Sequence, residues 1–151
     1  GRQLASTSGS MGYGIPAAVA AALEYPDRQV IAMTGDGDIQ MTSQELATVV
    51  QEGLSIVVIV VNNGMLGTIR MHQEMHYPGR TENTDLHNPD FVALAGAHGF
   101  AAERITQTAE FGPALRRALD ASGSTLIELV TDAEAIAHTA TLSEIRARST
   151  S

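Results

Sequence analysis

Two short polar turns carry the residue types that could hold a metal ion beside a phosphate. Gly35-Asp36-Gly37 and Asn62-Asn63-Gly64 each directly follow a run of apolar residues. A carboxylate and a carboxamide oxygen are hard ligands, so Asp36 and Asn63 suit Mg²⁺ or Ca²⁺ better than a thiolate-seeking metal. We favour Mg²⁺, because it typically uses one or two protein carboxylates and completes its coordination with phosphate oxygens, water or backbone carbonyls.

The elements around these turns are expected to bring them together. The apolar runs at residues 29–33 and 55–61 predict strands, the first buried on both faces, and the second rich in β-branched residues. The interval between the turns accommodates one helix and one returning strand, so a right-handed crossover would place Asp36 and Asn63 at the same sheet edge. Ligands of open parallel sheets bind at that carboxyl edge.

The remaining pattern alternates between helical and extended segments. Thr42 or Ser43 could cap the helix that follows the first turn, and Glu45 would complete a capping box with Thr42. Helices are predicted at residues 16–24, 42–52, 66–75, 89–97 and 110–121, and further strands at 100–105 and 125–130. This alternation predicts an α/β fold, a mainly parallel sheet with helices on both faces.

Composition narrows the functional classes. The 151 residues carry a formal charge of −8 without a basic cluster, which argues against nucleic-acid binding, and the absence of cysteine excludes disulfides and thiolate ligands. The longest aliphatic run, residues 56–61, is far too short to span a membrane, and no signal peptide is evident, so a cytoplasmic protein is expected. We expect one domain over residues 1–151, with a tail from about residue 136, as the C-terminal fragment of a larger enzyme.

A family resemblance rests on these turns and their flanks. The triplet at residues 35–37, followed by Asn62-Asn63, resembles the thiamine-diphosphate fingerprint. Together with residues 8–18 (SGSMGYGIPAA) and 64–70 (GMLGTIR), it is similar to the acetolactate synthase and pyruvate oxidase branch of thiamine-diphosphate-dependent enzymes along nearly the whole chain. The thiamine-diphosphate-binding fold of that family agrees with the α/β class expected from the pattern.

The resemblance implies a role for each matching position. Asp36, Asn63 and the backbone carbonyl of Met65 would be Mg²⁺ ligands. The Gly9 carbonyl and the Met11 N–H would contact the cofactor's pyrimidine, and the Met11 side chain would wedge under its thiazolium. The full set of implied cofactor-binding residues is Gly9, Ser10, Met11, Gly35, Gly37, Asp38, Asn63, Met65, Leu66 and Gly67.

The activity that the resemblance implies is decarboxylation of a pyruvate-like 2-oxo acid followed by carboligation, within a transferase or lyase. Its activating glutamate would come from the N-terminal domain of a partner subunit in a homodimer or tetramer, so no catalytic side chain is expected here and the isolated chain should be inactive. FAD is possible in the full enzyme.

Alternatives are a lyase or oxidase resembling benzoylformate decarboxylase or pyruvate oxidase, and a non-catalytic cofactor-binding domain. A generic nucleotide-binding domain is disfavoured, because neither GxGxxG nor a P-loop lysine motif is present.

Three features depart from the family pattern or suggest other chemistry. Asp38 stands where acetolactate synthases often have serine, and its carboxylate would repel a diphosphate unless it turns away or binds a further cation. Arg70 replaces an expected apolar residue and could read a substrate carboxylate, although a solvated or salt-bridged arginine is the simpler interpretation. His72 and His76 are spaced i, i+4 but lack the glutamate of the HExxH zinc signature, which favours a plain surface helix.

Overall fold

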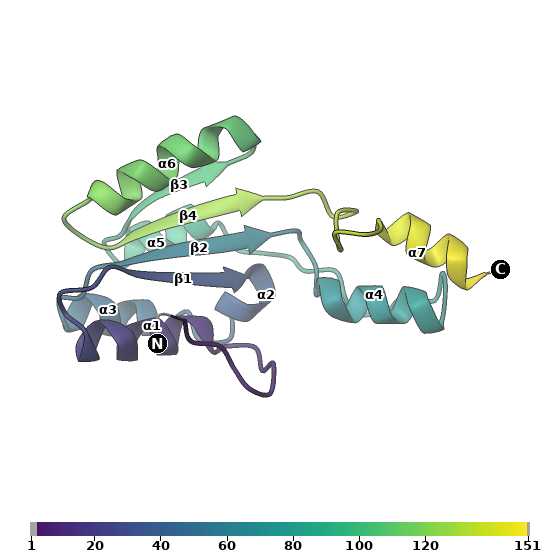
Figure 1. Ribbon diagram of the computed structural model, residues 1–151, viewed down its shortest axis with the longest axis horizontal. Coiled ribbons are helices and arrows are strands. Elements are labelled where there is room, and N and C mark those ends of the chain that lie inside the picture. The colour runs from purple at the N-terminus through teal and green to yellow at the C-terminus, as the bar shows by residue number, and fades with distance from the viewer. Residues whose placement is uncertain (1–2, 151) are drawn as a thin grey trace.

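The computed structural model describes residues 3–150, which form one parallel sheet with helices around it (Figure 1). The strands are β1 (Val30–Gly35), β2 (Ile56–Asn62), β3 (Ala101–Ile105) and β4 (Thr125–Val130), in the spatial order β1-β2-β4-β3. The helices are α1 (Gly14–Glu24), α2 (Asp36–Ile39), α3 (Glu45–Gln51), α4 (Gly67–His76), α5 (Phe91–Ala97), α6 (Thr108–Asp120) and α7 (Leu142–Ser149). The predicted α/β class with a parallel sheet is confirmed.

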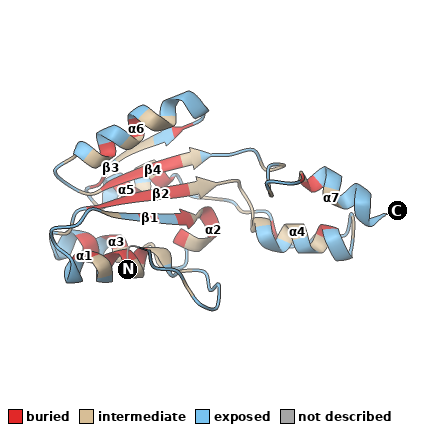
Figure 2. Ribbon diagram, in the orientation of Figure 1, coloured by how far each residue is buried: buried red, intermediate tan, exposed pale blue. Residues whose placement is uncertain are grey.

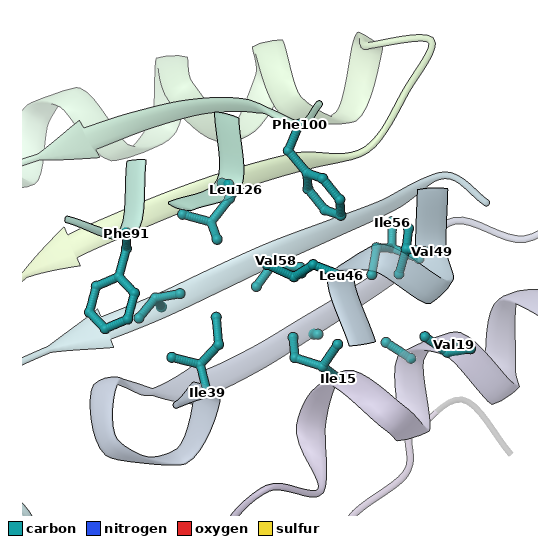
Figure 3. Packing of buried hydrophobic residues seen from close by; sticks show 14 of the residues in the cluster. Ile15, Val19, Ile39, Leu46, Val49, Ile56, Val58, Phe91, Phe100 and Leu126 are labelled. Atoms are coloured by element: carbon teal, nitrogen blue, oxygen red, sulfur yellow. The ribbon is translucent and has the colours of Figure 1, made fainter. Parts of the chain in front are cut away.

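Two apolar layers cover the two faces of this sheet. The larger cluster joins α1, α3 and α5 to one face and is filled by side chains such as Ile15, Leu46, Val58 and Phe91 (Figure 3). The smaller cluster packs Ala114 and Ala118 of α6 against the other face. Helices therefore lie on both faces, as the alternating pattern predicted.

The prediction that the first strand is buried on both faces was wrong. In β1, Ala32 and Thr34 are buried, but Ile31 and Met33 on the opposite face are 47% and 70% exposed. The reason is the reach of α6, which contacts β3 and β4 and leaves the outer face of β1 uncovered within the described residues. A continuous apolar run at a sheet edge can thus have one exposed face.

The predicted capping box at the start of α3 was also wrong. α3 begins at Glu45 without a side-chain cap. The Thr42 hydroxyl instead donates to the carbonyl of Gly12, 3.1 Å away, and Glu45 accepts from Thr48. Thr42 therefore stabilises the loop before α1. The short helix α2, which the sequence analysis did not predict, lies between the first turn and α3.

The C-terminal segment, expected as a tail from about residue 136, contains the helix α7, which packs on α4. α7 and α4 lie side by side beyond the carboxyl ends of the strands (Figure 1), and we call this pair the arm. The guanidinium of Arg146 donates twice to the carboxylate of Glu74, through Nε at 2.8 Å and through a shorter contact from its terminal nitrogen. A charged pair thus joins the two helices of the arm.

Candidate functional site

The carboxylate of Asp36 lies between the two predicted turns. β1 and β2 pair in parallel with Gly35 opposite Val61, so the turns leave the sheet at the same edge. The side chain of Asp36 is buried, and its Oδ2 accepts from the N–H of Gly64 at 2.9 Å. The prediction that a crossover brings these turns together is confirmed.

The two oxygens of Asp36 are used unequally. Oδ2 accepts two hydrogen bonds, from the Gly64 N–H and from the Asn88 side-chain amide at 2.7 Å. Oδ1 accepts one, from the N–H of Gly37 at 3.0 Å. Because a carboxylate oxygen offers about two acceptor sites, Oδ1 keeps one for a further donor or a cation.

The second turn, whose Gly64 N–H binds this carboxylate, also carries the amide of Asn63 and the carbonyl of Met65. Asn63 Oδ1 accepts from the N–H of Met65 at 3.1 Å. An isolated antiparallel bridge pairs Met65 with Asp85, and its hydrogen bonds use the Gly64 carbonyl and the Leu66 N–H, each at 2.8 Å. The peptide groups of Met65 itself therefore face the other way, and its carbonyl has no recorded donor within residues 3–150.

Two glycines allow a close approach of side chains at the site. A Cβ on Gly37 would lie 2.7 Å from Leu66 and 3.2 Å from the methyl of Met11. A Cβ on Gly67 would lie 2.8 Å from the amide nitrogen of Asn63. The structure thus brings residues 11, 37 and 66 into one cluster and sets residue 67 against residue 63.

The loop before α1 is held in a specific conformation. Gly9 and Gly12 have positive φ angles of 67° and 83°, which glycine adopts without strain. Ser10 donates its N–H to Ser6 and its hydroxyl lies 2.7 Å from that of Ser8. Met11 is 36% exposed, so its side chain reaches the site while keeping one side open.

Asp38 turns away from the turn at residues 62–64. Its Oδ1 accepts a short hydrogen bond from the N–H of Gly12, and its Oδ2 accepts from the hydroxyl of Thr34 at 2.8 Å. Of the two possibilities open for this carboxylate, the structure supports the one in which it turns away. It joins β1 to the loop that carries Met11.

A polar network that the sequence analysis missed lies beneath the site. Asn62 donates to Glu128 at 2.7 Å, and Arg104 donates to the other oxygen of Glu128 at 2.7 Å. Glu128 is buried, and its hydrogen bond and charge raise the pKa of Arg104 above the ordinary range. The available signal was a glutamate between apolar residues of strand β4, because a buried carboxylate requires a partner.

This network continues into the cap of α5. Arg104 also donates to Asp90 at 2.8 Å. Asp90 accepts from the N–H groups of Val92 and Ala93 at the start of the helix. The pKa of Asp90 is lowered, first by the Ala93 N–H and then by the charge of Arg104, although desolvation opposes both.

Arg70 and His72 belong to the arm. Arg70 donates to Asp85 at 2.9 Å, and its Nε lies 3.6 Å from Glu74, so the salt-bridged interpretation of this arginine is confirmed. His72 is exposed and its ring stacks on that of His76 at 6.2 Å between centroids, as expected for a surface helix.

Three other findings bear on what this chain can do. A hollow of about 380 Å³ lies at the opposite, amino edge of the sheet between Ala22, Arg28 and Ala118, away from the chemistry described above. Within residues 3–150, no group of three or more acidic or histidine side chains gathers as a metal cluster. The described helices also include none with the length and apolarity to cross a membrane.

Comparison with protein families gives a match over most of the chain. The model described as "Thiamine pyrophosphate enzyme, C-terminal TPP binding domain" matches residues 2–129. That range contains every predicted site residue, from Gly9 to Gly67.

Curated relatives agree with this match. The acetolactate synthase large subunit of Corynebacterium glutamicum is 45% identical over 115 residues, covering 73% of this chain and 18% of that protein. The acetolactate synthase isozyme 3 large subunit of Escherichia coli is 40% identical over 113 residues, covering 74% of this chain and 20% of that protein. This chain therefore spans about a fifth of the length of these relatives.

A solved structure is similar in both fold and sequence. The thiamine diphosphate-dependent 4-hydroxybenzoylformate decarboxylase of Rhodococcus jostii RHA1 has a TM-score of 0.77 and 38% sequence identity to this chain. The similarity covers 83% of this chain and 24% of that one.

Proposed function

This chain belongs to the thiamine pyrophosphate enzymes, as their C-terminal TPP-binding domain, and from that premise we propose that it binds thiamine diphosphate with Mg²⁺ for decarboxylation of a 2-oxo acid. The carrying observation is the position of Asp36, buried between the two turns with one acceptor site of Oδ1 unused. Carboligation of the decarboxylated fragment, as the names of the acetolactate synthase relatives imply, is the favoured outcome.

The donor set at this edge fits Mg²⁺. Asp36 Oδ1, the side-chain oxygen of Asn63 and the Met65 carbonyl are three hard oxygen ligands on adjacent turns. Mg²⁺ prefers such oxygens and fills its remaining positions with phosphate oxygens and water. The three groups predicted as metal ligands are therefore retained in the proposal.

The neighbouring backbone fits a diphosphate. α4 begins at Gly67 without a side-chain cap, so its first N–H groups lack a side-chain acceptor beside Asn63. Uncapped N–H groups at a helix start favour an anion. We assign the diphosphate contacts to Gly35, Gly37, Asp38, Leu66 and Gly67, with the Asp38 carboxylate itself bonded to Gly12 and Thr34.

The loop before α1 would hold the rest of the cofactor. We propose that the Gly9 carbonyl and the Met11 N–H orient the pyrimidine, with Ser10 between them in the serine-bonded turn. The contact of Met11 with the Gly37 and Leu66 cluster supports its side chain as the wedge under the thiazolium. Thiamine diphosphate, when bound, supplies an electron sink for the carbanion left by decarboxylation.

Part of the machinery is assigned to other chains or domains. We propose that the activating glutamate comes from the N-terminal domain of a partner subunit, so the enzyme acts as a homo-oligomer and the 151-residue chain alone turns over no substrate. FAD in another domain and a cytoplasmic location remain predictions of the same proposal.

A second activity is favoured by one specific observation. The similar solved structure is a thiamine diphosphate-dependent decarboxylase of an aromatic 2-oxo acid. Simple release of an aldehyde after decarboxylation would use the same residues of this chain, and the two outcomes differ in the acceptor, a second 2-oxo acid or a proton.

Product analysis tests the proposal and separates the two outcomes. The full protein, supplied with thiamine diphosphate and Mg²⁺, is incubated with pyruvate and with benzoylformate, alongside an Asp36→Ala variant and an Asp27→Ala control on the exposed turn before β1. We expect CO₂ and a carboligation product from pyruvate, lost only in Asp36→Ala. Aldehyde alone would establish the decarboxylase alternative, and activity retained in Asp36→Ala would overturn the assigned site.

A further inference from the structure

Asn88 makes a hydrogen bond with each of three different side chains at the site. Its Nδ2 donates to Asp36 Oδ2 at 2.7 Å and to Asn62 Oδ1 at 2.9 Å. Its Oδ1 accepts from Gln40 Nε2 at 2.8 Å. Both of its N–H groups and one acceptor site are therefore engaged, although residue 88 lies in the loop far along the chain from both turns.

The direction of these hydrogen bonds is determined by Glu128, which acts on Asn88 through Asn62. Glu128 accepts only, so Asn62 must offer it the NH₂ group and turn its oxygen toward Asn88. Asn88 must then point its own NH₂ group at that oxygen and at Asp36. The reverse orientation of Asn88 would set an oxygen against the Asp36 carboxylate, which is repulsive.

The backbone that carries Asn88 is also held. Asp90, two residues later, caps α5 and pairs with Arg104, which in turn binds Glu128. Residue 88 is therefore linked to Glu128 twice, through its side chain by Asn62 and through the following backbone by Asp90 and Arg104, which limits its movement relative to the sheet edge.

The consequence falls on Asp36. The Asn88 and Gly64 donors saturate Oδ2, which leaves Oδ1 as the oxygen with an unused acceptor site. We propose that Asn88 is a positioning residue that holds the Asp36 carboxylate in the rotamer that presents Oδ1 to the divalent cation. This inference rests on the proposed function, because the cation at Asp36 is part of it.

Such a role has a recognisable signature. Hydrogen bonds to a ligating carboxylate change metal affinity, typically by about 10- to 100-fold, while the fold itself persists. If Asn88 acted only by packing, an apolar side chain of similar size at this position would preserve the metal affinity. Asn88→Ala and Asn88→Leu together distinguish donation from packing.

The test uses Mn²⁺ as a paramagnetic probe. Its binding to the full protein is measured by EPR titration in the presence of thiamine diphosphate. The matched control is His87→Ala, which removes an exposed neighbouring side chain on the same loop. We expect both Asn88 variants to raise the Mn²⁺ dissociation constant about 10-fold, with an unchanged number of sites and His87→Ala equal to wild type. Thermal unfolding of each variant accompanies the titration.

The outcomes separate this inference from the function beneath it. Absence of Mn²⁺ binding in wild type, or binding that survives Asp36→Ala, would contradict both. Loss in Asp36→Ala with Asn88→Ala or Asn88→Leu within twofold of His87→Ala would overturn the role of Asn88 alone. If the Asn88 variants do not fold, Gln40→Ala carries the test, because it removes the donor to Asn88 Oδ1, together with a 3.2 Å hydrogen bond to the Asp36 carbonyl, and leaves both donors to Asp36 Oδ2 in place. An increase of about 3-fold in its dissociation constant supports the role, and no change overturns it.

Discussion

The sheet body, made of the four strands with α1, α3, α5 and α6, and the arm, made of α4 and α7, are stabilised by different interactions. In the body, buried residues run along β2 and β4 and the helices that cover them, whereas the arm is largely exposed (Figure 2). The arm instead depends on Glu74, which is fully buried and bound by Arg146 and Arg70. Apolar burial is insensitive to pH and to single charges, so the two regions should respond to different perturbations.

The largest expected effect is on the body. Phe91 is fully buried in the main cluster, and Phe91→Ala should lower the free energy of unfolding by about 3–5 kcal/mol, through lost burial and the cavity left behind. Denaturant unfolding measures this loss. Leu23→Ala on the exposed side of α1 is the control and should change stability by less than about 0.5 kcal/mol. Equal effects of the two changes would show that the body has no such core.

The next effect is confined to the arm. Glu74→Gln removes the charge that holds Arg146 and should destabilise the packing of α7 on α4 by about 1–2 kcal/mol, between the values for exposed and fully buried pairs. Hydrogen exchange should quicken in α7 while β2 and β4 keep their protection. Glu82→Gln, an exposed acid on the adjacent loop, is the control. Equal loss of protection in the strands would mean that body and arm unfold as one unit.

Acid sharpens the same comparison. The pKa of Glu74 is lowered from 4.5 to about 2, chiefly by the hydrogen bond from Arg146, with help from the Gly79 N–H and the charges of both arginines, and against the effect of desolvation. Because the pKa of Glu74 is lower in the folded state than in the unfolded state, its ionised carboxylate stabilises the folded arm at pH above 4.5. That stabilisation is lost as the pH falls toward 2.

We therefore expect exchange in α7 to be constant from pH 7 to about 5, once corrected for intrinsic rates, and to rise below that range. In Glu74→Gln this additional acid sensitivity should be absent. A variant that keeps the full acid response would assign it to another carboxylate.

The smallest effect is expected where the arm meets the site. A Cβ on Gly67 would come within 2.5 Å of the Ile136 side chain, which places Ile136 at the start of α4. Ile136→Ala should cost about 1 kcal/mol or less, because the side chain is only half-buried. It should weaken thiamine diphosphate binding by about 2- to 3-fold. An unchanged affinity would show that Ile136 and the site are independent.

Much of the architecture followed from local pattern. The apolar runs, the polar turns after them and the rule for strand ends correctly placed Asp36 beside the turn at residues 62–64, because these features depend on sequence neighbours and strand direction. The exposed face of β1 did not follow, since exposure depends on how far α6 extends across the sheet. The Thr42 hydroxyl was likewise diverted from its predicted cap by a partner distant in sequence, Gly12.

The polar network of Asn62, Asn88, Arg104 and Glu128 could not be predicted from local pattern either, because its members are distant from one another in sequence. Asn88 contributes to the site through the packing of its loop, and no local periodicity marks it. Only Glu128, a carboxylate within an apolar strand, indicated that a buried partner must exist. The sequence therefore predicts residues at strand ends better than the side chains that orient them.

Calorimetric titration of thiamine diphosphate into the full chain tests the central claim most directly, with Mg²⁺, with EDTA, and in Asp36→Ala with Asp27→Ala as control. The account predicts heat of binding that requires Mg²⁺, is retained in Asp27→Ala and disappears in Asp36→Ala. Binding of equal strength in EDTA or in Asp36→Ala would contradict the assignment of this edge of the sheet as the cofactor and metal site.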